Sequence, residues 1–149
     1  MKSLVIEAGG RLDLGTGRVT VAAGGFAESA VQGWLLSGRN GGAWNGATGI
    51  MSRAAPLGSR RAVGNRTSGG ILTLAWAAFG DVNLDGRVNS IDVTLLSTSG
   101  RFNAPGATSR WDHGDFNYDG RVNSIDVALL SSSGLFNQPS YRTGPGTTD

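Results

Sequence analysis

The sequence contains no cysteine and only one histidine, which restricts the chemistry that its side chains can perform. Without cysteine, the chain forms neither disulfides nor thiolate metal sites. Carboxylates are sparse before residue 80, where only Glu7, Asp13 and Glu28 occur, whereas a glycosidase needs two that face each other across a cleft. His113 is interpreted as a solvated loop residue rather than a base. The chain is therefore predicted to be non-catalytic, with any glycoside hydrolase activity upstream or on a separate chain.

Long apolar runs are absent too. No segment approaches the roughly 20 apolar residues that a membrane-spanning helix needs. The first residues do not lead into the apolar stretch of a signal peptide, because Glu7 and the pair Gly9-Gly10 follow at once. Either the protein is made without an export signal, or the chain is the C-terminal piece of a longer protein. We expect the second, since the sequence opens inside an expected strand.

Charge is low and unevenly distributed. Charged residues make up 16% of the chain. Residues 1–79 contain eight Lys or Arg and three Asp or Glu, whereas residues 80–149 contain five and eight, so the net charge changes from +5 to −3. This change predicts a domain boundary near residue 80, and the 25 glycines predict short elements joined by many turns.

Apolar periodicity predicts a small β-rich unit with one short helix over residues 1–79. The expected strands cover residues 4–8, 12–14, 17–23 and 72–78, and the expected helix covers residues 26–36. Trp44 lies in a loop of glycine and asparagine and is interpreted as a core residue, with carbohydrate binding as the alternative. The arginines of residues 53–70 favour a solvated loop over a nucleic-acid surface, because no series of aromatic residues accompanies them.

One segment occurs twice, because residues 80–103 align without a gap with residues 114–137. Its first part reads Asp-Val-Asn-Leu-Asp-Gly-Arg-Val-Asn-Ser-Ile-Asp at 81–92 and Asp-Phe-Asn-Tyr-Asp-Gly-Arg-Val-Asn-Ser-Ile-Asp at 115–126. A calcium loop of about 12 residues presents oxygen atoms at positions 1, 3, 5, 7, 9 and 12 and turns sharply at a glycine in position 6. Both copies fit this spacing, which predicts two calcium ions.

The predicted ligands in each loop are five side chains and one backbone carbonyl. They are Asp81, Asn83, Asp85, Asn89 and Asp92 with the carbonyl of Arg87, and Asp115, Asn117, Asp119, Asn123 and Asp126 with the carbonyl of Arg121. Three carboxylates at close quarters repel one another unless a cation balances their charge. A plain surface turn is the alternative, since Asp, Asn and Gly are common turn residues, but two copies in one register favour metal binding.

A short helix is expected after each loop, at residues 90–98 and 124–132, with Ser90 and Ser124 as the N-caps. No helix enters either loop, because a strand precedes the first and a segment with Pro and Gly precedes the second. Both are therefore half EF-hands, which argues against a calcium sensor whose paired helices open. Such short helices barely form alone, so metal binding and folding are expected to be one event.

Two apolar contacts are expected to join the repeats. Val88 and Val122, at position 8 of each loop, are expected to pair as a small strand. The second contact is expected between the two antiparallel helices and involves Val93, Leu96, Val127 and Leu130.

The duplicated pattern Asp-x-Asn-x-Asp-Gly-x-x-Asn-x-x-Asp, followed by a short helix, resembles the type I dockerin domain over residues 80–141. The resemblance implies a domain that folds on calcium and binds cohesin modules, usually to attach carbohydrate-active enzymes to an extracellular scaffold. The fold class expected for the chain is α+β, with a β-rich N-terminal unit followed by an all-α dockerin. Residues 1–79 resemble the end of large repetitive bacterial surface proteins, and residues 142–149 are expected to be a disordered tail.

The resemblance also implies a partner-binding face. Positions 10, 11, 17 and 18 of each dockerin repeat contact cohesin, and here they are Ser90, Ile91, Ser97 and Thr98, then Ser124, Ile125, Ser131 and Ser132. An apolar anchor surrounded by serines fits a partner surface, and two nearly identical faces would let a partner bind either helix after a half-turn. The alternative is that one or both isoleucines pack against the N-terminal unit.

Two functions stay open. The first is a calcium-dependent docking module that binds a cohesin-type partner and anchors an extracellular protein or a polysaccharide-degrading assembly. The second is a structural terminus of a bacterial surface or matrix protein that calcium only makes rigid. Both place the chain outside the cell or at its surface, with neither nucleic acid nor a membrane span involved.

Overall fold

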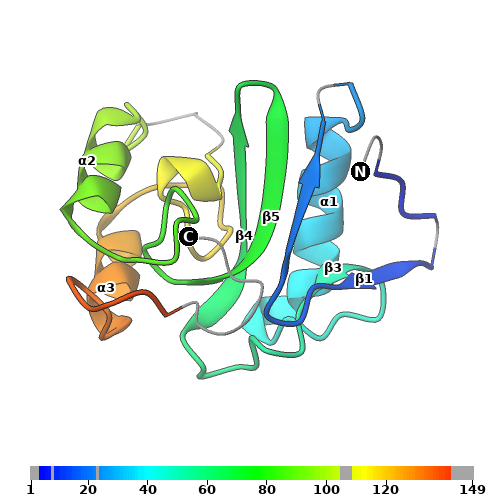
Figure 1. Cartoon of the computed structure of the whole chain (residues 1–149), viewed down its shortest axis with the longest axis horizontal. Coiled ribbons are helices and arrows are strands. Elements are labelled where there is room, and N and C mark those ends of the chain that lie inside the picture. The colour runs from blue at the N-terminus through cyan, green and yellow to red at the C-terminus, as the bar shows by residue number, and fades with distance from the viewer. Residues whose placement is uncertain (1–3, 8, 23, 105–108, 142–149) are drawn as a thin grey trace. The chain divides into compact units, whose positions relative to one another are not determined.

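The computed structural model describes residues 4–7, 9–22, 24–104 and 109–141 (Figure 1). The chain divides into two compact units, Met1–Trp76 and Ala77–Asp149. We refer to them as the N-terminal unit and the C-terminal unit and describe each by itself. The tail predicted at residues 142–149 lies outside the described residues.

The N-terminal unit combines two small sheets with one helix. In the first sheet, β1 (Arg11–Asp13) pairs in parallel with β3 (Gly49–Met51). In the second sheet, β5 (Ile71–Ala78) lies between β2 (Arg18–Val21) and β4 (Arg61–Ser68), and β2 and β5 run antiparallel. The helix is α1 (Glu28–Arg39), and a short 3-10 helix, η1 (Asn40–Gly42), follows it.

A close backbone contact joins α1 to β3. A Cβ atom placed on Gly38 would lie 1.7 Å from the carbonyl oxygen of Ile50, so the contact requires glycine. Val31 and Leu35 are fully buried on the same helix. Trp44 is only 1% exposed, which confirms its interpretation as a core residue.

The N-terminal predictions were right for β1, β2, β5 and the helix, although the helix begins and ends two or three residues later than expected. Two predictions were wrong. Residues 4–7 form no strand, and the expected solvated loop at residues 53–70 contains β4. Residues 62–65 of β4 are buried, and the guanidinium of Arg61 lies 5.5 Å from the ring centre of Trp76, so this arginine partly covers apolar surface.

The C-terminal unit contains α2 (Ser90–Thr98), a 3-10 helix η2 (Trp111–His113) and α3 (Ser124–Ser132). The bounds of α2 and α3 are those predicted. The expectation of an all-α region was wrong, because the region is mixed: β5 extends into it and two parallel β-bridges join Val88 to Phe136 and Phe102 to Val122. Val88 and Val122 therefore do not pair with each other.

The two bridges have a common cause in the path of the chain. After α2 and after α3 the chain returns along the loop of the other repeat; we call these stretches the first return segment (residues 101–104 and 109) and the second return segment (residues 135–141). The N–H of Asn103 donates to the carbonyl of Val122 (2.7 Å), and the N–H of Asn137 donates to that of Val88 (2.8 Å). Each loop is thus paired with the segment that follows the other repeat's helix.

Two glycines let the helices pack tightly against the starts of the loops. A Cβ atom on Gly80 would lie 2.6 Å from Leu130, and one on Gly114 would lie 2.7 Å from Leu96. Leu96 and Leu130 are accordingly 4% and 6% exposed. The expected contact between the helices is looser, since Val93 and Val127 are each 40% exposed. These four side chains, with Ser97 and Phe102, line a hollow of about 300 Å³.

Candidate metal centre

The first loop holds its carboxylates with backbone N–H groups. Oδ1 of Asp81 accepts a hydrogen bond from the N–H of Asp85 (3.1 Å), and its Oδ2 accepts one from Gly86 (2.9 Å). Oδ1 of Asp92 accepts from Val82 and its Oδ2 from Asn89, both at 2.9 Å. Asp92 is the third residue of α2, so the same carboxylate closes the loop and caps the helix.

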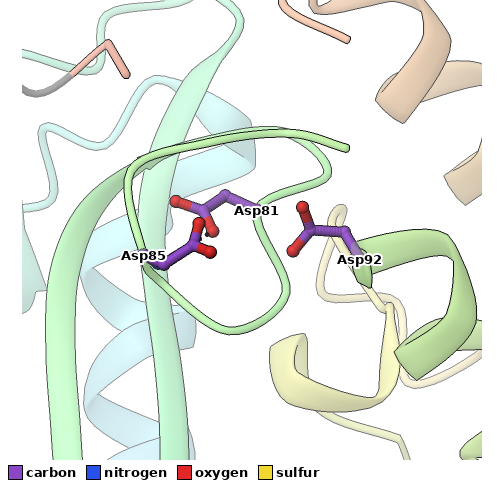
Figure 2. Close-up of side chains that lie close together, drawn as sticks. All are labelled: Asp81, Asp85 and Asp92. Atoms are coloured by element: carbon purple, nitrogen blue, oxygen red, sulfur yellow. Dashed lines mark hydrogen bonds between the residues drawn. The ribbon is translucent and has the colours of Figure 1, made fainter. Parts of the chain in front are cut away.

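Three carboxylates of this loop converge. Ligand oxygens of Asp81, Asp85 and Asp92 all lie within 4.8 Å of one another (Figure 2). Calcium binds oxygen at about 2.3–2.6 Å, so oxygens on opposite sides of one ion lie about 5 Å apart. The spacing and the all-oxygen donor set therefore fit a hard divalent cation.

The two asparagines of the first loop are already partly engaged. Oδ1 of Asn83 accepts from the N–H of Asp85 (3.2 Å), and Oδ1 of Asn89 accepts from the N–H of Ile91 (3.0 Å). Asn89, not Ser90, is thus the N-cap of α2, and Asn123 rather than Ser124 caps α3. An amide oxygen has two lone pairs, so one remains for a ligand after this bond is made.

The second loop repeats most of these bonds. Asp115 accepts from the N–H groups of Asp119 (3.3 Å) and Gly120 (2.9 Å). Asp126 accepts from Phe116 and from Asn123, both at 2.9 Å, and Asp119 accepts from the N–H of Arg121 (2.9 Å), as Asp85 does from Arg87.

The second loop nevertheless differs at its centre. Among the residues that the structure describes, the first loop supplies the one group of three acidic side chains whose ligand atoms lie this close together. In the second loop the side-chain amide of Asn117 donates to Oδ2 of Asp119 (3.3 Å). The sequence pattern is therefore the same in both loops, while the arrangement of their carboxylates is not.

Burial makes these carboxylates costly to ionise. It raises the pKa of Asp81 and of Asp115 to about 7 and that of Asp92 to about 6, and it also raises the pKa of Asp126. Backbone N–H donors oppose the shift in every case, and neighbouring carboxylates increase it. A divalent cation would relieve the repulsion and stabilise the ionised forms.

The comparison with protein families gives one match. Residues 79–133 match the family described as the dockerin type I domain. This segment is a type I dockerin domain. Dockerins of this type are non-catalytic modules that bind calcium and cohesin modules, and they occur in extracellular cellulosome components. The comparisons with curated proteins and with solved structures found no match.

The predicted partner face of the dockerin is exposed. All eight of its residues are exposed, and Ile91 and Ile125 are each 54% exposed.

Within the described part of the chain, none of the helices has the length and apolar character needed to cross a bilayer.

Three residues of the C-terminal unit have roles that the sequence did not reveal. His113 is half-buried and accepts a hydrogen bond from the N–H of Arg110 at Nδ1 (3.0 Å), so the interpretation as a solvated residue was wrong. Trp111 is fully buried and donates from Nε1 to the carbonyl of Asp81 (2.9 Å). The phenol of Tyr141 donates to Oδ2 of Asp81. Neither Trp111 nor Tyr141 lies inside a repeat, so the loop spacing gives no signal for them.

Proposed function

We propose that the C-terminal unit is a calcium-dependent docking module that binds two calcium ions and, through α2 or α3, a cohesin module of a partner protein. The observation that carries the proposal is the junction of loop and helix. Three carboxylates converge at the first turn of α2, and an exposed isoleucine lies beside the last of them, at position 11. The metal site and the partner face therefore meet in α2, which contains both Asp92 and Ile91.

The calcium ligands in this proposal are the six positions of each loop named above. Bound calcium would supply positive charge that balances three carboxylates in each loop. Asp92 and Asp126 have a double role, because each also accepts hydrogen bonds from two backbone N–H groups, one at position 2 of its loop and one at the N-cap of its helix. Ordering them for calcium would also order α2 and α3, which at nine residues each are too short to be stable alone.

The partner face is proposed on each helix separately. Ile91 and Ile125 would each be an apolar anchor, with the exposed serines and Thr98 around it. Exposed apolar side chains on a small module favour a binding role when polar residues surround them. Because the two faces carry nearly the same residues, a cohesin would find an equivalent surface after a half-turn of the module.

Binding by a panel of type I cohesin modules tests the proposal, with affinities measured by isothermal titration calorimetry in calcium and in a chelator. Ile91→Ala or Ile125→Ala alone is expected to weaken binding about twofold, because one of two equivalent orientations is lost. The double variant is expected to lose about 30-fold or more, the usual cost of removing a central anchor. Ile71→Ala is the matched control, since Ile71 is 48% exposed but lies in the N-terminal unit.

The same measurements separate docking from a structural role. Binding of a cohesin in calcium and not in the chelator supports the docking module. Calcium uptake without binding to any cohesin of the panel would favour a structural terminus that calcium makes rigid. An extracellular anchoring role, in a polysaccharide-degrading assembly or another one, rests on the docking result.

A further inference from the structure

Tyr141 makes two contacts with the first loop. Its backbone N–H donates to the carbonyl of Gly86 (3.0 Å), and its phenol donates to Oδ2 of Asp81 (2.5 Å). These contacts join position 1 and position 6 of the loop to one residue of the second return segment. Tyr141 lies beyond residues 79–133, which match the dockerin family, so the match assigns it no role.

The phenol fixes the orientation of a carboxylate that faces the acidic cluster. Oδ2 of Asp81 receives two donors, the N–H of Gly86 and the phenol of Tyr141, while Oδ1 receives the N–H of Asp85. Hydrogen-bond partners of this kind hold a metal ligand in its binding orientation. A ligand that is already oriented loses less conformational freedom when it binds the ion.

The second loop provides an internal comparison. The backbone N–H of Ser109, in the first return segment, donates to the carbonyl of Gly120 (2.9 Å), as that of Tyr141 does to Gly86. The side chain differs, however. Asp115 accepts hydrogen bonds from the N–H groups of Asp119 and Gly120 and receives none from the Ser109 hydroxyl. The two return segments therefore share a backbone contact, and the first loop alone has a phenol on its position 1.

We propose that Tyr141 is a positioning residue for the first calcium site and makes this site the tighter of the two. The proposal rests on the proposed function, because it concerns the ion that the first loop would hold. It is consistent with the carboxylate arrangement, since the loop that Tyr141 contacts is also the one whose three carboxylates converge. It extends the working module past α3, to residue 141.

Nuclear magnetic resonance distinguishes the two loops in the intact chain. The N–H groups of Gly86 and Gly120 each donate to the position 1 carboxylate of their own loop, so their resonances report the two sites separately. The full chain is titrated in solutions of buffered free calcium. In Tyr141→Phe, which keeps the ring and the backbone bond, half-saturation at Gly86 is expected to need about tenfold more calcium. Half-saturation at Gly120 is expected not to change.

Ser109→Ala is the matched control, because it removes a hydroxyl at the corresponding place beside the second loop. We expect it to leave the calcium concentration for half-saturation unchanged at both Gly86 and Gly120. Equal weakening at Gly86 and Gly120 in Tyr141→Phe would mean a general loss of stability and would overturn the proposal, as would no change at either. If neither glycine responds to calcium in the unsubstituted chain, the proposed function itself fails, and that result is separate from a failure of Tyr141.

Discussion

The two predicted calcium loops share ten of their twelve residue identities and all of their predicted ligand types, yet they are braced differently. The first loop receives the phenol of Tyr141 on its position 1 carboxylate and the indole N–H of Trp111 on the carbonyl of the same residue. The second loop receives the backbone N–H of Ser109 on the carbonyl of Gly120. The spacing of the ligands in each loop is set by the repeated sequence, whereas the geometry of the ligands also depends on residues outside the repeats.

Removal of calcium is the largest change that tests what the two loops have in common. In excess chelator at neutral pH, we expect α2 and α3 to lose their protection against hydrogen exchange, because the three carboxylates of each loop, two of them buried, then repel one another and nine-residue helices do not persist alone. The strands of the N-terminal unit, which contains no predicted ligand, are expected to stay protected. Mass-spectrometric hydrogen exchange measures both. Protection of α2 or α3 that survives the chelator would contradict the coupling of folding to metal.

Substitution of the two packed glycines tests whether the loops are equivalent in their packing. Gly80→Ala and Gly114→Ala place a methyl group against Leu130 and Leu96 at distances shorter than any real contact, at φ of 101° and 111°. We expect each to destabilise the calcium-loaded module by about 1–3 kcal/mol beyond the backbone strain. Thermal unfolding in calcium measures the effect.

Gly134→Ala is the control for these glycines, because its φ is 72° but nothing lies within 4 Å of the added methyl group. It reports the backbone strain alone, about 1 kcal/mol. If Gly80→Ala costs no more than Gly134→Ala, the tight contact with Leu130 is not present in solution. A large difference between Gly80→Ala and Gly114→Ala would show that the repeats are packed unequally.

Acidification is expected to have the smallest effect, and to change the stability of the calcium-free unit and the calcium affinity in opposite directions. The folded-state pKa values of Asp81 and Asp115 are raised from 3.8 to about 7. The calcium-free fold therefore binds protons more tightly than the unfolded chain does. This contribution to stability is fully present below the unfolded pKa of about 3.8 and is lost as the pH rises to about 7. The calcium-free unit is thus expected to keep more structure at pH 5 than at pH 8.

Calcium binding has the opposite dependence on pH, since protons compete with the ion for the same oxygens. Calorimetric titration at pH 6, 7 and 8 is expected to give a calcium affinity that increases with pH. The number of protons released, obtained by repeating the titration in buffers of different ionisation enthalpy, is expected to fall between pH 6 and pH 8. Affinity that does not depend on pH would contradict the raised pKa values.

The sequence predicted the parts of the structure that depend on local spacing. The bounds of α2 and α3 follow from loops whose last carboxylate lies at a fixed distance from the turn at Gly86 or Gly120, so they were found correctly. The N-caps were misplaced by one residue because Asn and Ser both cap helices well. Asn89 takes the role since its side chain reaches the N–H of Ile91 while its own N–H reaches Asp92.

The parts that depend on distant pairing were not predictable in this way. Val88 and Val122 occupy the same position in identical surroundings, and no local signal says that each pairs with a return segment instead of with the other. β4 was missed because Gly64 and the flanking arginines hide the apolar pattern of a strand whose middle is buried. Tyr141 could be found only from the folded path, since its partner Asp81 is 60 residues away in the sequence.

Because the return segments cross between the repeats, a fragment that keeps the pairing of its loops has to contain both repeats and both return segments. A fragment cut after the first return segment would carry a loop whose partner segment lies beyond the cut, together with a return segment that has no loop to pair with. Either half alone would leave main-chain hydrogen-bonding groups without partners, which is costly wherever water is excluded. Each repeat therefore supplies backbone hydrogen bonds that the loop of the other repeat needs.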